Sequence, residues 1–383
     1  MRIAINMVSL HTGGGNRIAK NLLLSLEKHP EHDYLIFIPK QTGFEYILER
    51  SDIHYTVYFK AHRKTSFWGR LWFDNVTIPR KIAQFKADIL ISLTNISTFF
   101  PKIPHIVLFH HPHFVYPESP YYHMIGLGER IRKELEKICF RFTLKRSAAT
   151  VVQTPVSGER LLKYYSRFIT RDRIHIIPHS AIPITPESAK KFDYSYDTDT
   201  LYIFSPTRYY PHKNLELLGR IAEELHKRDI TGIKFLITLE PSHDSRCERF
   251  LKTISSTPIN QYFDNLGFVE TECLENIYKH IDIVIVQSLL ESQSFSYLEA
   301  LYFQKPIITT DMDFAHIVCG KAARYFSPEN PGEWADFLIQ IKNNPEMLET
   351  MSKASNIRAK SYLVSSDDVC QAYLDLAQKS VAN

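Results

Sequence analysis

Apolar and polar residues alternate along this chain in two recurring patterns. Short runs of β-branched and aromatic residues predict strands, and the stretches between them have the three-to-four-residue apolar spacing of amphipathic helices. In the first half the predicted strands are residues 2–7, 34–39, 53–59, 88–94, 105–110, 149–154 and 174–179. Strands that alternate with helices are typical of a mainly parallel, doubly wound sheet, so this half predicts one complete α/β domain.

A second α/β series follows a stretch without apolar periodicity. Residues 181–200 are rich in Pro, Ser, Thr and Asp, which indicates a linker. Beyond it the predicted strands are residues 201–206, 233–239, 262–268, 281–286, 305–310 and 323–327, and the predicted final helices are residues 331–343, 345–361 and 367–379. The pattern predicts domains at 1–180 and 201–361, with residues 362–383 as a C-terminal helix that packs back on the first domain.

The composition is that of a soluble globular protein. The 383 residues are 44% hydrophobic and 23% charged. The longest apolar runs fall far short of the roughly 20 residues of a membrane-spanning helix, and the opening MRIAINMVSL does not resemble a signal peptide. Scattered cysteines without a CxxC pair indicate reduced thiols. We therefore expect a cytoplasmic protein, and a net charge of +4 is too small to indicate nucleic-acid binding.

Three consecutive glycines, Gly13, Gly14 and Gly15, come soon after the first predicted strand. Glycine lets the backbone approach a ligand closely, and the following helix offers N–H groups to a phosphate or sugar. The spacing is not GxGxxG, so it does not indicate a dinucleotide site. The alternative is a flexible turn between strand and helix.

Charged side chains follow two predicted strands of the second half. Arg208 and Lys213 come after the strand at 201–206 and suit the oxygens of a diphosphate; the alternative is two solvated charges in a loop. Glu291 and Glu299 bound the uncharged run in ESQSFSYLEA, after the strand at 281–286. A carboxylate at such a place can accept hydrogen bonds from vicinal hydroxyls, or can simply be favoured by the helix dipole.

The same segment predicts a helix start. Ser292 or Ser294 is the expected N-cap, and Leu298, Leu301 and Tyr302 form an apolar helical face that Glu299 flanks. Backbone amides at that helix start are expected to meet a phosphate.

These motifs together resemble the retaining glycosyltransferases of family 4, which have the GT-B fold. The resemblance covers nearly the whole chain and rests on Gly13 to Gly15, Arg208 with Lys213, Glu291-x7-Glu299-Ala300, Lys305-Pro306-Ile307-Ile308, NLGFVE (265–270) and IHIIPHS (174–180). It implies two Rossmann-like, doubly wound domains that face a central cleft.

The resemblance also implies roles for the matching residues. Glu299 would bind the ribose hydroxyls and Glu291 the hydroxyls of the donor sugar. Arg208 and Lys213 would neutralise the diphosphate as it leaves, and the glycines would bring backbone amides to the phosphate. The residues so expected to bind the donor are Gly14, Gly15, Arg208, Lys213, Phe268, Ser294, Phe295 and Glu299.

One turn departs from the family pattern. The family usually has Gly-Phe-Gly just after the first glutamate, whereas this chain has Ser292-Gln293-Ser294-Phe295. We expect the donor preference of this protein to depend on that turn.

Three histidines follow the strand at 105–110, in LFHHPHFVYPE. The family resemblance implies that His110 lies against the donor sugar, with His111 as the alternative. No acidic residue or cysteine stands at a convincing ligand spacing from them, so a metal ranks below the other interpretations, which include strand-end packing. The acid pairs Asp197 with Asp199 and Asp311 with Asp313 are interpreted as structural, because Arg208, Lys213 and amides already supply the positive charge.

A basic amphipathic segment occupies residues 126–148. Its basic residues are Arg130, Arg132, Lys133, Lys137, Arg141, Lys145 and Arg146, and its apolar residues Ile131, Leu135, Ile138, Phe142 and Leu144 predict a buried face. The basic side is either solvated or a docking surface for an anionic membrane or a lipid-linked acceptor.

The prediction is a retaining, metal-independent hexosyltransferase without a cofactor. It would move a sugar from a UDP or GDP donor to a hydroxyl of a glycan or lipid-linked saccharide in cell-surface polysaccharide synthesis, at the inner face of the cell membrane or in the cytoplasm. Retention is implied by the resemblance alone. The alternatives are a nucleotide-sugar epimerase or hydrolase on the same fold, and a non-catalytic protein that binds sugar nucleotides.

Overall fold

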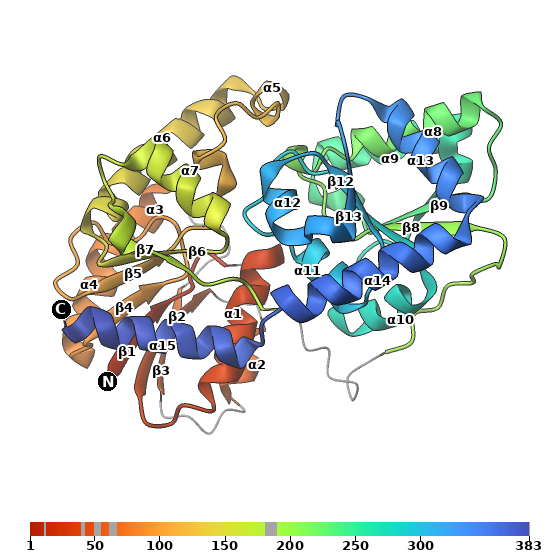
Figure 1. Cartoon of the computed structure of the whole chain (residues 1–383). Coiled ribbons are helices and arrows are strands. Elements are labelled where there is room, and N and C mark those ends of the chain that lie inside the picture. Colours follow the sequence, from red (N-terminus) through yellow and green to blue (C-terminus); the bar gives the residue numbers. More distant parts are fainter. Residues whose placement is uncertain (11–12, 40–42, 50–54, 61–66, 181–189, 383) are drawn as a thin grey trace. The chain divides into compact units, whose positions relative to one another are not determined.

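The computed structural model describes residues 1–10, 13–39, 43–49, 55–60, 67–180 and 190–382 (Figure 1). The chain divides into two compact units. Unit 1 comprises Met1–Pro117, Gly126–Ser180 and Val364–Asn383, and unit 2 comprises Glu118–Ile125 and Ala181–Leu363. Residues 181–189 of the predicted linker and residues 53 and 54 of a predicted strand lie outside the described residues.

Unit 1 is built on a parallel seven-stranded sheet with the order β3-β2-β1-β4-β5-β6-β7. Its strands are β1 (Arg2–Asn6), β2 (Asp33–Pro39), β3 (Tyr55–Lys60), β4 (Ile89–Ser92), β5 (His105–Leu108), β6 (Ala149–Val152) and β7 (Ile174–Ile176). The strand order reverses between β1 and β4, and open α/β sheets bind ligands beyond the carboxyl ends of strands at such a reversal. The connections after β1, β4 and β5 are therefore the places to look for a site.

Helices cover both faces of this sheet because its buried strands are apolar on both sides. The helices of unit 1 are α1 (Gly13–Leu26), α2 (Phe44–Glu49), α3 (Phe67–Trp72), α4 (Ile78–Phe85), α6 (Leu127–Arg146), α7 (Pro155–Tyr165) and α15 (Ser366–Ala382). Ile3 and Ile5 of β1 join one core cluster, and Ala4 between them joins another, which follows from the two-residue period of a strand.

The last helix of the chain, α15, packs in unit 1 against α1 (Figure 1). Leu22 and Leu26 of α1 share a core cluster with Tyr373 and Leu374 of α15. Each fully buried side chain of this size contributes about 1.5–3 kcal/mol relative to exposure, so the C-terminal helix is a substantial part of this core.

Unit 2 is built on a parallel six-stranded sheet with the order β10-β9-β8-β11-β12-β13. Its strands are β8 (Leu201–Ser205), β9 (Ile233–Ile237), β10 (Phe263–Asn265), β11 (Ile283–Val286), β12 (Ile307–Thr310) and β13 (Ala323–Phe326). The order reverses between β8 and β11, which are the strands followed by Arg208 and Lys213 and by Glu291. The arrangement of both sheets is the two-domain α/β fold that the sequence predicted.

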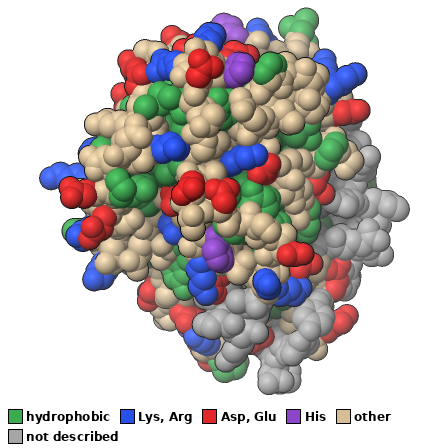
Figure 2. Space-filling view, turned by 90° about the vertical axis from the view of Figure 1, so that its right-hand side faces the viewer, with side chains coloured by type: hydrophobic (Ala, Val, Ile, Leu, Met, Phe, Trp, Pro, Cys, Tyr) green, Lys and Arg blue, Asp and Glu red, His purple; other side chains and the backbone are tan. Residues whose placement is uncertain are grey.

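The helices of unit 2 are α5 (Tyr121–Met124), α8 (Glu216–Lys227), α9 (Ser245–Ser255), α10 (Leu274–His280), α11 (Phe295–Tyr302), α12 (Asp313–Cys319), α13 (Pro331–Lys342) and α14 (Pro345–Tyr362). Ile221 of α8 and Leu338 of α13 lie in one core cluster with Trp334, whose indole N–H donates to the carbonyl of Ser327 at 2.9 Å. Figure 2 shows the face that lies to the right in Figure 1, where basic and acidic side chains are interspersed.

The segment Glu118–Ile125 belongs to unit 2 although it lies between β5 and α6 in sequence. The hydroxyl of Ser119 donates to the carbonyl of Leu289 at 3.3 Å, and the ring of Tyr121 meets the ring of His212 at 5.9 Å. The predicted first domain, 1–180, included this segment. Its contacts connect residues far apart in sequence, which strand and helix patterns do not show.

The exposed side of α6 differs from the prediction. Ile131, Leu135, Ile138 and Phe142 are 54%, 45%, 45% and 53% exposed, whereas Leu144 is buried. The predicted buried face is therefore wrong for four of its five residues, because the helix rests on unit 1 through Phe140, Thr143 and Leu144 instead. Among the described helices, none is both long enough and apolar enough to cross a membrane.

Candidate functional site

Lys213 and Glu291 meet at the carboxyl ends of β8 and β11. Lys213 Nζ lies 2.5 Å from Glu291 Oε1, and the two side chains are 16% and 11% exposed. Lys213 ends a 3-10 turn (Pro211–Lys213), and the amide of Leu289 donates to the carbonyl of His212 at 2.7 Å. That backbone bond holds the turn after β8 against the loop after β11, so the ion pair follows from how the two connections are joined.

Arg208 lies in the same connection but contacts other groups. Its Nη2 is 3.8 Å from Glu240 Oε2, and its guanidinium is 6.0 Å from the ring centroid of Phe268, which is 60% exposed. Among the described contacts, no hydrogen bond or ion pair joins Arg208 to Lys213 or Glu291. Because Arg208 is paired only at salt-bridge distance, a ligand with negative charge can compete for it.

Glu299 is buried in the second turn of α11 and is held by a residue that the sequence did not indicate. The phenol of Tyr278, on α10, donates to Glu299 Oε2 at 2.8 Å. The ring of Tyr278 is itself stacked on Phe303 with centroids 4.5 Å apart. The hydrogen bond fixes one carboxylate oxygen, and nothing in the spacing of residues 278 and 299 could have shown it.

The turn between the two glutamates is buried. Ser294 takes the predicted N-cap position of α11, with an extended backbone, but its side chain makes no capping hydrogen bond. Gln293 Nε2 donates to the hydroxyl of Tyr362 at 2.8 Å, which ties the turn to the end of α14. Phe295 is the first residue of the helix and is partly exposed.

The first turn of α11 opens onto a small hollow in unit 2. The hydroxyl of Ser296 donates to the carbonyl of Pro206 at 3.1 Å. The hollow is lined by Ser205, Pro206, Thr207, Lys213, Ile285, Val286, Gln287, Ser288 and Ser296. Helix N-termini attract anions, and here one adjoins the Lys213 ammonium, although the hollow itself has room for only about one water molecule.

In unit 1, the three glycines form the first turn of α1 rather than a loop before it. Gly13 has φ +63°, in the left-handed region that favours glycine, and it is exposed, as is Gly14. A side chain at Gly15 would come within 2.9 Å of Leu10 Cδ2, so Leu10 would have to shift. The helix start is open at Gly14 and closely packed at Gly15.

His110 follows β5 and is held by Asn95, which follows β4. Asn95 Oδ1 accepts hydrogen bonds from the amides of His110 at 2.8 Å and His111 at 3.0 Å. Asn95 Nδ2 must then donate to His110 Nε2, 3.4 Å away, which leaves the proton of the neutral ring on Nδ1. Among the described residues no hydrogen-bond partner meets Nδ1 of His110, and this atom is buried.

Burial keeps this histidine neutral. It lowers the pKa of His110 to about 4. Burial, together with the nearby His110, lowers the pKa of His179 to about 3. At neutral pH His110 therefore presents an uncharged N–H donor rather than an imidazolium.

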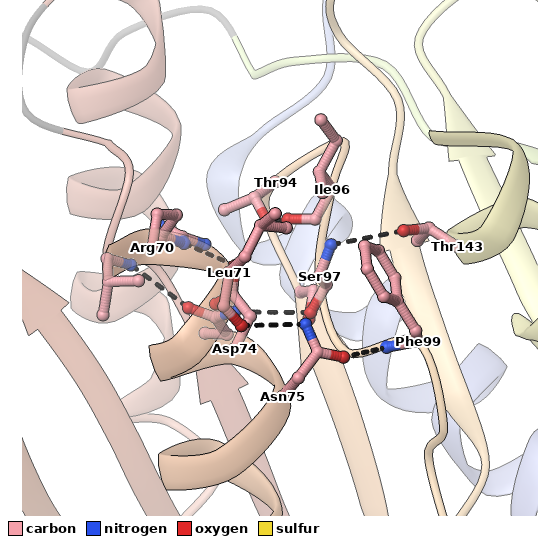
Figure 3. A network of polar contacts seen from close by, with 12 residues as sticks. Arg70, Leu71, Asp74, Asn75, Thr94, Ile96, Ser97, Phe99 and Thr143 are labelled. Atoms are coloured by element: carbon pink, nitrogen blue, oxygen red, sulfur yellow. Dashed lines mark hydrogen bonds and ion pairs between the residues drawn. The ribbon is translucent and has the colours of Figure 1, made fainter. Parts of the chain in front are cut away.

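The loop that carries Asn95 is fastened by the contacts in Figure 3. Asn75 Oδ1 accepts from the amide of Phe99 at 2.7 Å, and Thr143 Oγ1 accepts from the amide of Ser97 at 3.3 Å. Asn75 lies in a π-helical turn (Phe73–Thr77) between α3 and α4. These two bonds anchor the loop that carries Asn95 to the π-helical turn and to α6.

Two further groups bear on metal binding. The acids interpreted as structural make local contacts. Asp197 Oδ2 accepts a hydrogen bond from the hydroxyl of Tyr202 at 3.0 Å, and Asp311 Oδ1 lies 2.6 Å from His316 Nε2. His111, His113 and Glu136 offer ligand atoms within 4.8 Å of one another. The sequence spacing did not indicate this cluster, because Glu136 comes from α6.

Two family models match the chain. Residues 12–181 match the model described as Glycosyltransferase Family 4, and residues 187–358 match the one described as Glycosyl transferases group 1. The alpha-monoglucosyldiacylglycerol synthase of Acholeplasma laidlawii is 34% identical over 133 residues, which are 34% of this chain and 33% of that protein. The poly(ribitol-phosphate) alpha-N-acetylglucosaminyltransferase of Staphylococcus aureus (strain COL) is 27% identical over 185 residues, 44% of this chain and 34% of that protein. The matches thus span about a third of the length of each curated relative.

Solved structures share the fold over the whole chain. Sucrose-phosphate synthase from Thermosynechococcus elongatus has a TM-score of 0.79 at 13% identity, covering 100% of this chain and 99% of the other. Anabaena HepE in complex with UDP and glucose has a TM-score of 0.70 at 14% identity, covering 99% and 100%. With both family models matched in chain order, the protein belongs to the family 4 glycosyltransferases of the GT-B fold.

Proposed function

We propose that this protein transfers a hexose-type sugar from a UDP or GDP donor to an acceptor hydroxyl, with retention at the anomeric carbon. The observation that carries the proposal is the Lys213–Glu291 pair beside the first turn of α11. One side chain suits the departing diphosphate and the other the sugar hydroxyls. The family membership and the UDP and glucose bound by HepE support a nucleotide-sugar donor.

Donor binding would exchange partners within this pair. The Lys213 ammonium leaves Glu291 for the diphosphate oxygens, and Glu291 accepts hydrogen bonds from the sugar instead. A buried carboxylate that loses its cation needs such replacement donors, so the exchange favours a ligand that offers both groups at once. Arg208 adds charge to the diphosphate, and Glu299 accepts from the ribose hydroxyls.

The chemical step breaks the bond between C1 of the sugar and the β-phosphate oxygen. A bond forms between C1 and the acceptor oxygen on the same face, and the acceptor proton passes to the departing phosphate oxygen. Lys213, Arg208 and the amides of α11 stabilise the charge that develops on the diphosphate, and preorganised charge of this kind supplies most of the rate in many enzymes. Neutral His110 would donate its Nδ1–H to a sugar oxygen.

We further propose that α6 docks unit 1 on an anionic membrane surface, from which a lipid-linked acceptor would be reached. Leu127, Ile131, Leu135, Ile138 and Phe142 recur every three or four residues and are all exposed. Basic residues outnumber acidic ones along the same helix. An apolar stripe with cationic flanks is the pattern of a helix that lies in a membrane interface. The name of the Acholeplasma relative, alpha-monoglucosyldiacylglycerol synthase, agrees with a lipid acceptor.

The proposed function is tested with radiolabelled UDP-glucose, UDP-N-acetylglucosamine and GDP-mannose, each with diacylglycerol vesicles and a panel of glycans. We expect transfer from one donor, an α-linked product from an α-linked donor, and loss of transfer by orders of magnitude in Lys213→Ala. The matched control is Lys234→Ala. It breaks the ion pair between Lys234 and Asp264, whose charged atoms are 3.1 Å apart, and neither residue lines the hollow. Wild-type rates in Lys213→Ala would end the proposal.

Incubation of the protein with the donor alone, without an acceptor, tests the alternative enzyme activities, and the acceptor panel tests the non-catalytic alternative. Rapid epimerisation or hydrolysis without an acceptor would favour the epimerase or hydrolase. Donor binding without turnover across the whole panel would favour the non-catalytic protein. Thermal shifts in the presence of each nucleotide diphosphate report binding independently of turnover, since a ligand of the native state raises its apparent stability.

A further inference from the structure

We infer that His111, His113 and Glu136 form a binding site for a divalent transition metal such as Zn²⁺ within unit 1. Their ligand atoms all lie within 4.8 Å of one another. Within the part of the chain that the structure describes, this is the one group of three or more His, Cys, Asp or Glu side chains close enough to share an ion. The inference does not depend on the proposed transfer reaction.

The geometry fits a tetrahedral ion after small side-chain movements. Two ligands at about 2.0–2.2 Å from one zinc ion lie about 3.3 Å apart when the coordination is tetrahedral. His113 Nε2 is already 3.5 Å from Glu136 Oε2. His113 and Glu136 are 9% and 18% exposed, so an ion between them would be largely shielded from water.

The ligand set selects the class of metal. Two imidazoles with one carboxylate suit zinc and its neighbours in the first transition row, whereas magnesium and calcium prefer oxygen ligands alone. Three protein ligands leave a fourth position for water or a further donor. The histidines sit on a 3-10 turn (Pro112–Phe114) and beside it, and Glu136 projects from the middle of α6, so the ion would clasp this turn to the helix.

Two cations compete with a metal for the carboxylate. Lys133 Nζ is 3.7 Å from Glu136 Oε2, and Arg132 Nε is 3.7 Å from Oε1. Both distances are longer than a hydrogen bond, so neither cation holds the carboxylate firmly. Lys133 is largely buried. A metal ion carries twice the charge and would displace Lys133 from Oε2.

This competition supplies a test with changes in both directions. The full-length protein is freed of metal with a chelator, and Zn²⁺ binding is measured by calorimetry and Co²⁺ binding by its visible absorption. We expect one ion per chain. His111→Asn, His113→Asn and Glu136→Gln should each weaken binding by more than about 100-fold, because changes outside the ligand set alone cost about 10- to 100-fold.

Lys133→Met should strengthen binding by about tenfold, since it removes a positive charge that lies 3.7 Å from the proposed ligand oxygen Glu136 Oε2. A misfolded variant cannot bind the metal more tightly. The gain in Lys133→Met therefore cannot come from misfolding, whereas weaker binding in the three ligand variants could. His123→Asn, an exposed histidine outside the cluster, is the matched control and should change nothing. Affinity that is equal in wild type, His113→Asn and Glu136→Gln would overturn the site and leave His113–Glu136 as an ion pair only.

Discussion

The phenol of Tyr278 holds one oxygen of the buried Glu299 carboxylate through a 2.8 Å hydrogen bond. If Glu299 binds the ribose, this hydrogen bond orients the Glu299 carboxylate toward the ribose hydroxyls. Tyr278→Phe keeps the ring stacked on Phe303 and removes the hydroxyl alone, so we expect weaker donor binding by about tenfold, the value of one hydrogen bond to a charged group. KM for the donor should rise while kcat changes little. A kcat effect with unchanged KM would instead place Tyr278 outside donor binding.

The Lys213–Glu291 pair should be needed for turnover more than for folding. Glu291→Gln keeps the shape of the side chain but removes its charge, and leaves the Lys213 ammonium largely buried without its partner. We expect a loss of transfer of at least about 100-fold, together with a fall in stability that urea unfolding will measure. The double variant Lys213→Met with Glu291→Gln should recover part of the stability and none of the activity. Recovery of activity in the double variant would exclude this chemistry.

The turn at Gln293 should control the donor site through α14. Gln293→Ala removes the 2.8 Å bond to Tyr362 and frees the buried turn between the glutamates. Tyr362→Phe removes the same bond from the other side. We expect both variants to change the ratio of kcat/KM between two donor sugars in the same direction, by a few fold. If the two variants act differently, the hydrogen bond does not set the preference.

Acid should destabilise unit 1 before its carboxyl groups titrate. Burial lowers the pKa of His105 to about 3 and of His110 to about 4, and burial with His110 lowers that of His179 to about 3. Each folded pKa is below the unfolded value of about 6.5, so the stabilisation is complete above pH 6.5 and is lost as the pH falls toward 4 for His110 and toward 3 for His105 and His179.

Each of these histidines contributes a slope that approaches about 1.4 kcal/mol per pH unit in that window. Urea unfolding at pH 7, 6 and 5 measures the combined slope. His179→Gln should reduce the pH dependence of the free energy of unfolding by the contribution of one histidine. This holds whatever the variant does to the stability at pH 7. A slope near zero between pH 6 and 5 would mean that these rings are not held neutral.

Membrane docking by α6 should depend on its apolar stripe. Replacing Ile131, Leu135 and Phe142 with Ser should weaken binding to vesicles that contain phosphatidylglycerol by at least about tenfold, and binding to vesicles of phosphatidylcholine alone should be weak in both proteins. The control replaces Leu24 and Ile357, exposed apolar residues on other helices. Equal loss in the control variant would argue against a specific role for α6.

Much of the fold could be predicted from the sequence because its signals are local. Each predicted strand has a counterpart in β1 to β13, since short β-branched runs between amphipathic stretches are typical of buried parallel strands. The orientation of α6 could not be predicted, because its apolar residues have helical spacing whether they face the core or the solvent. Only the packing of Phe140 and Leu144 decides between the two.

The candidate site shows the same division. The charged residues after β8 and β11 are visible in the sequence because they stand at strand ends. Asn95, Tyr278 and Glu136 are not, because each acts on a residue that the fold brings to it. Asn95 reaches the amide of His110 fifteen positions away, and Tyr278 reaches Glu299 twenty-one positions away. No short motif joins such pairs.

The interleaving of the two units limits how this protein can be recombined. Unit 2 contains Glu118–Ile125 as well as Ala181–Leu363, and unit 1 includes the final helix. A chimera with a single crossover near residue 181 would keep Ser119 and Tyr121 from this chain but take the rest of unit 2 from a relative. It would therefore replace the residues at positions 289 and 212, which Ser119 and Tyr121 contact here. An exchange of the whole of unit 2 with a relative therefore requires both of its segments to move together.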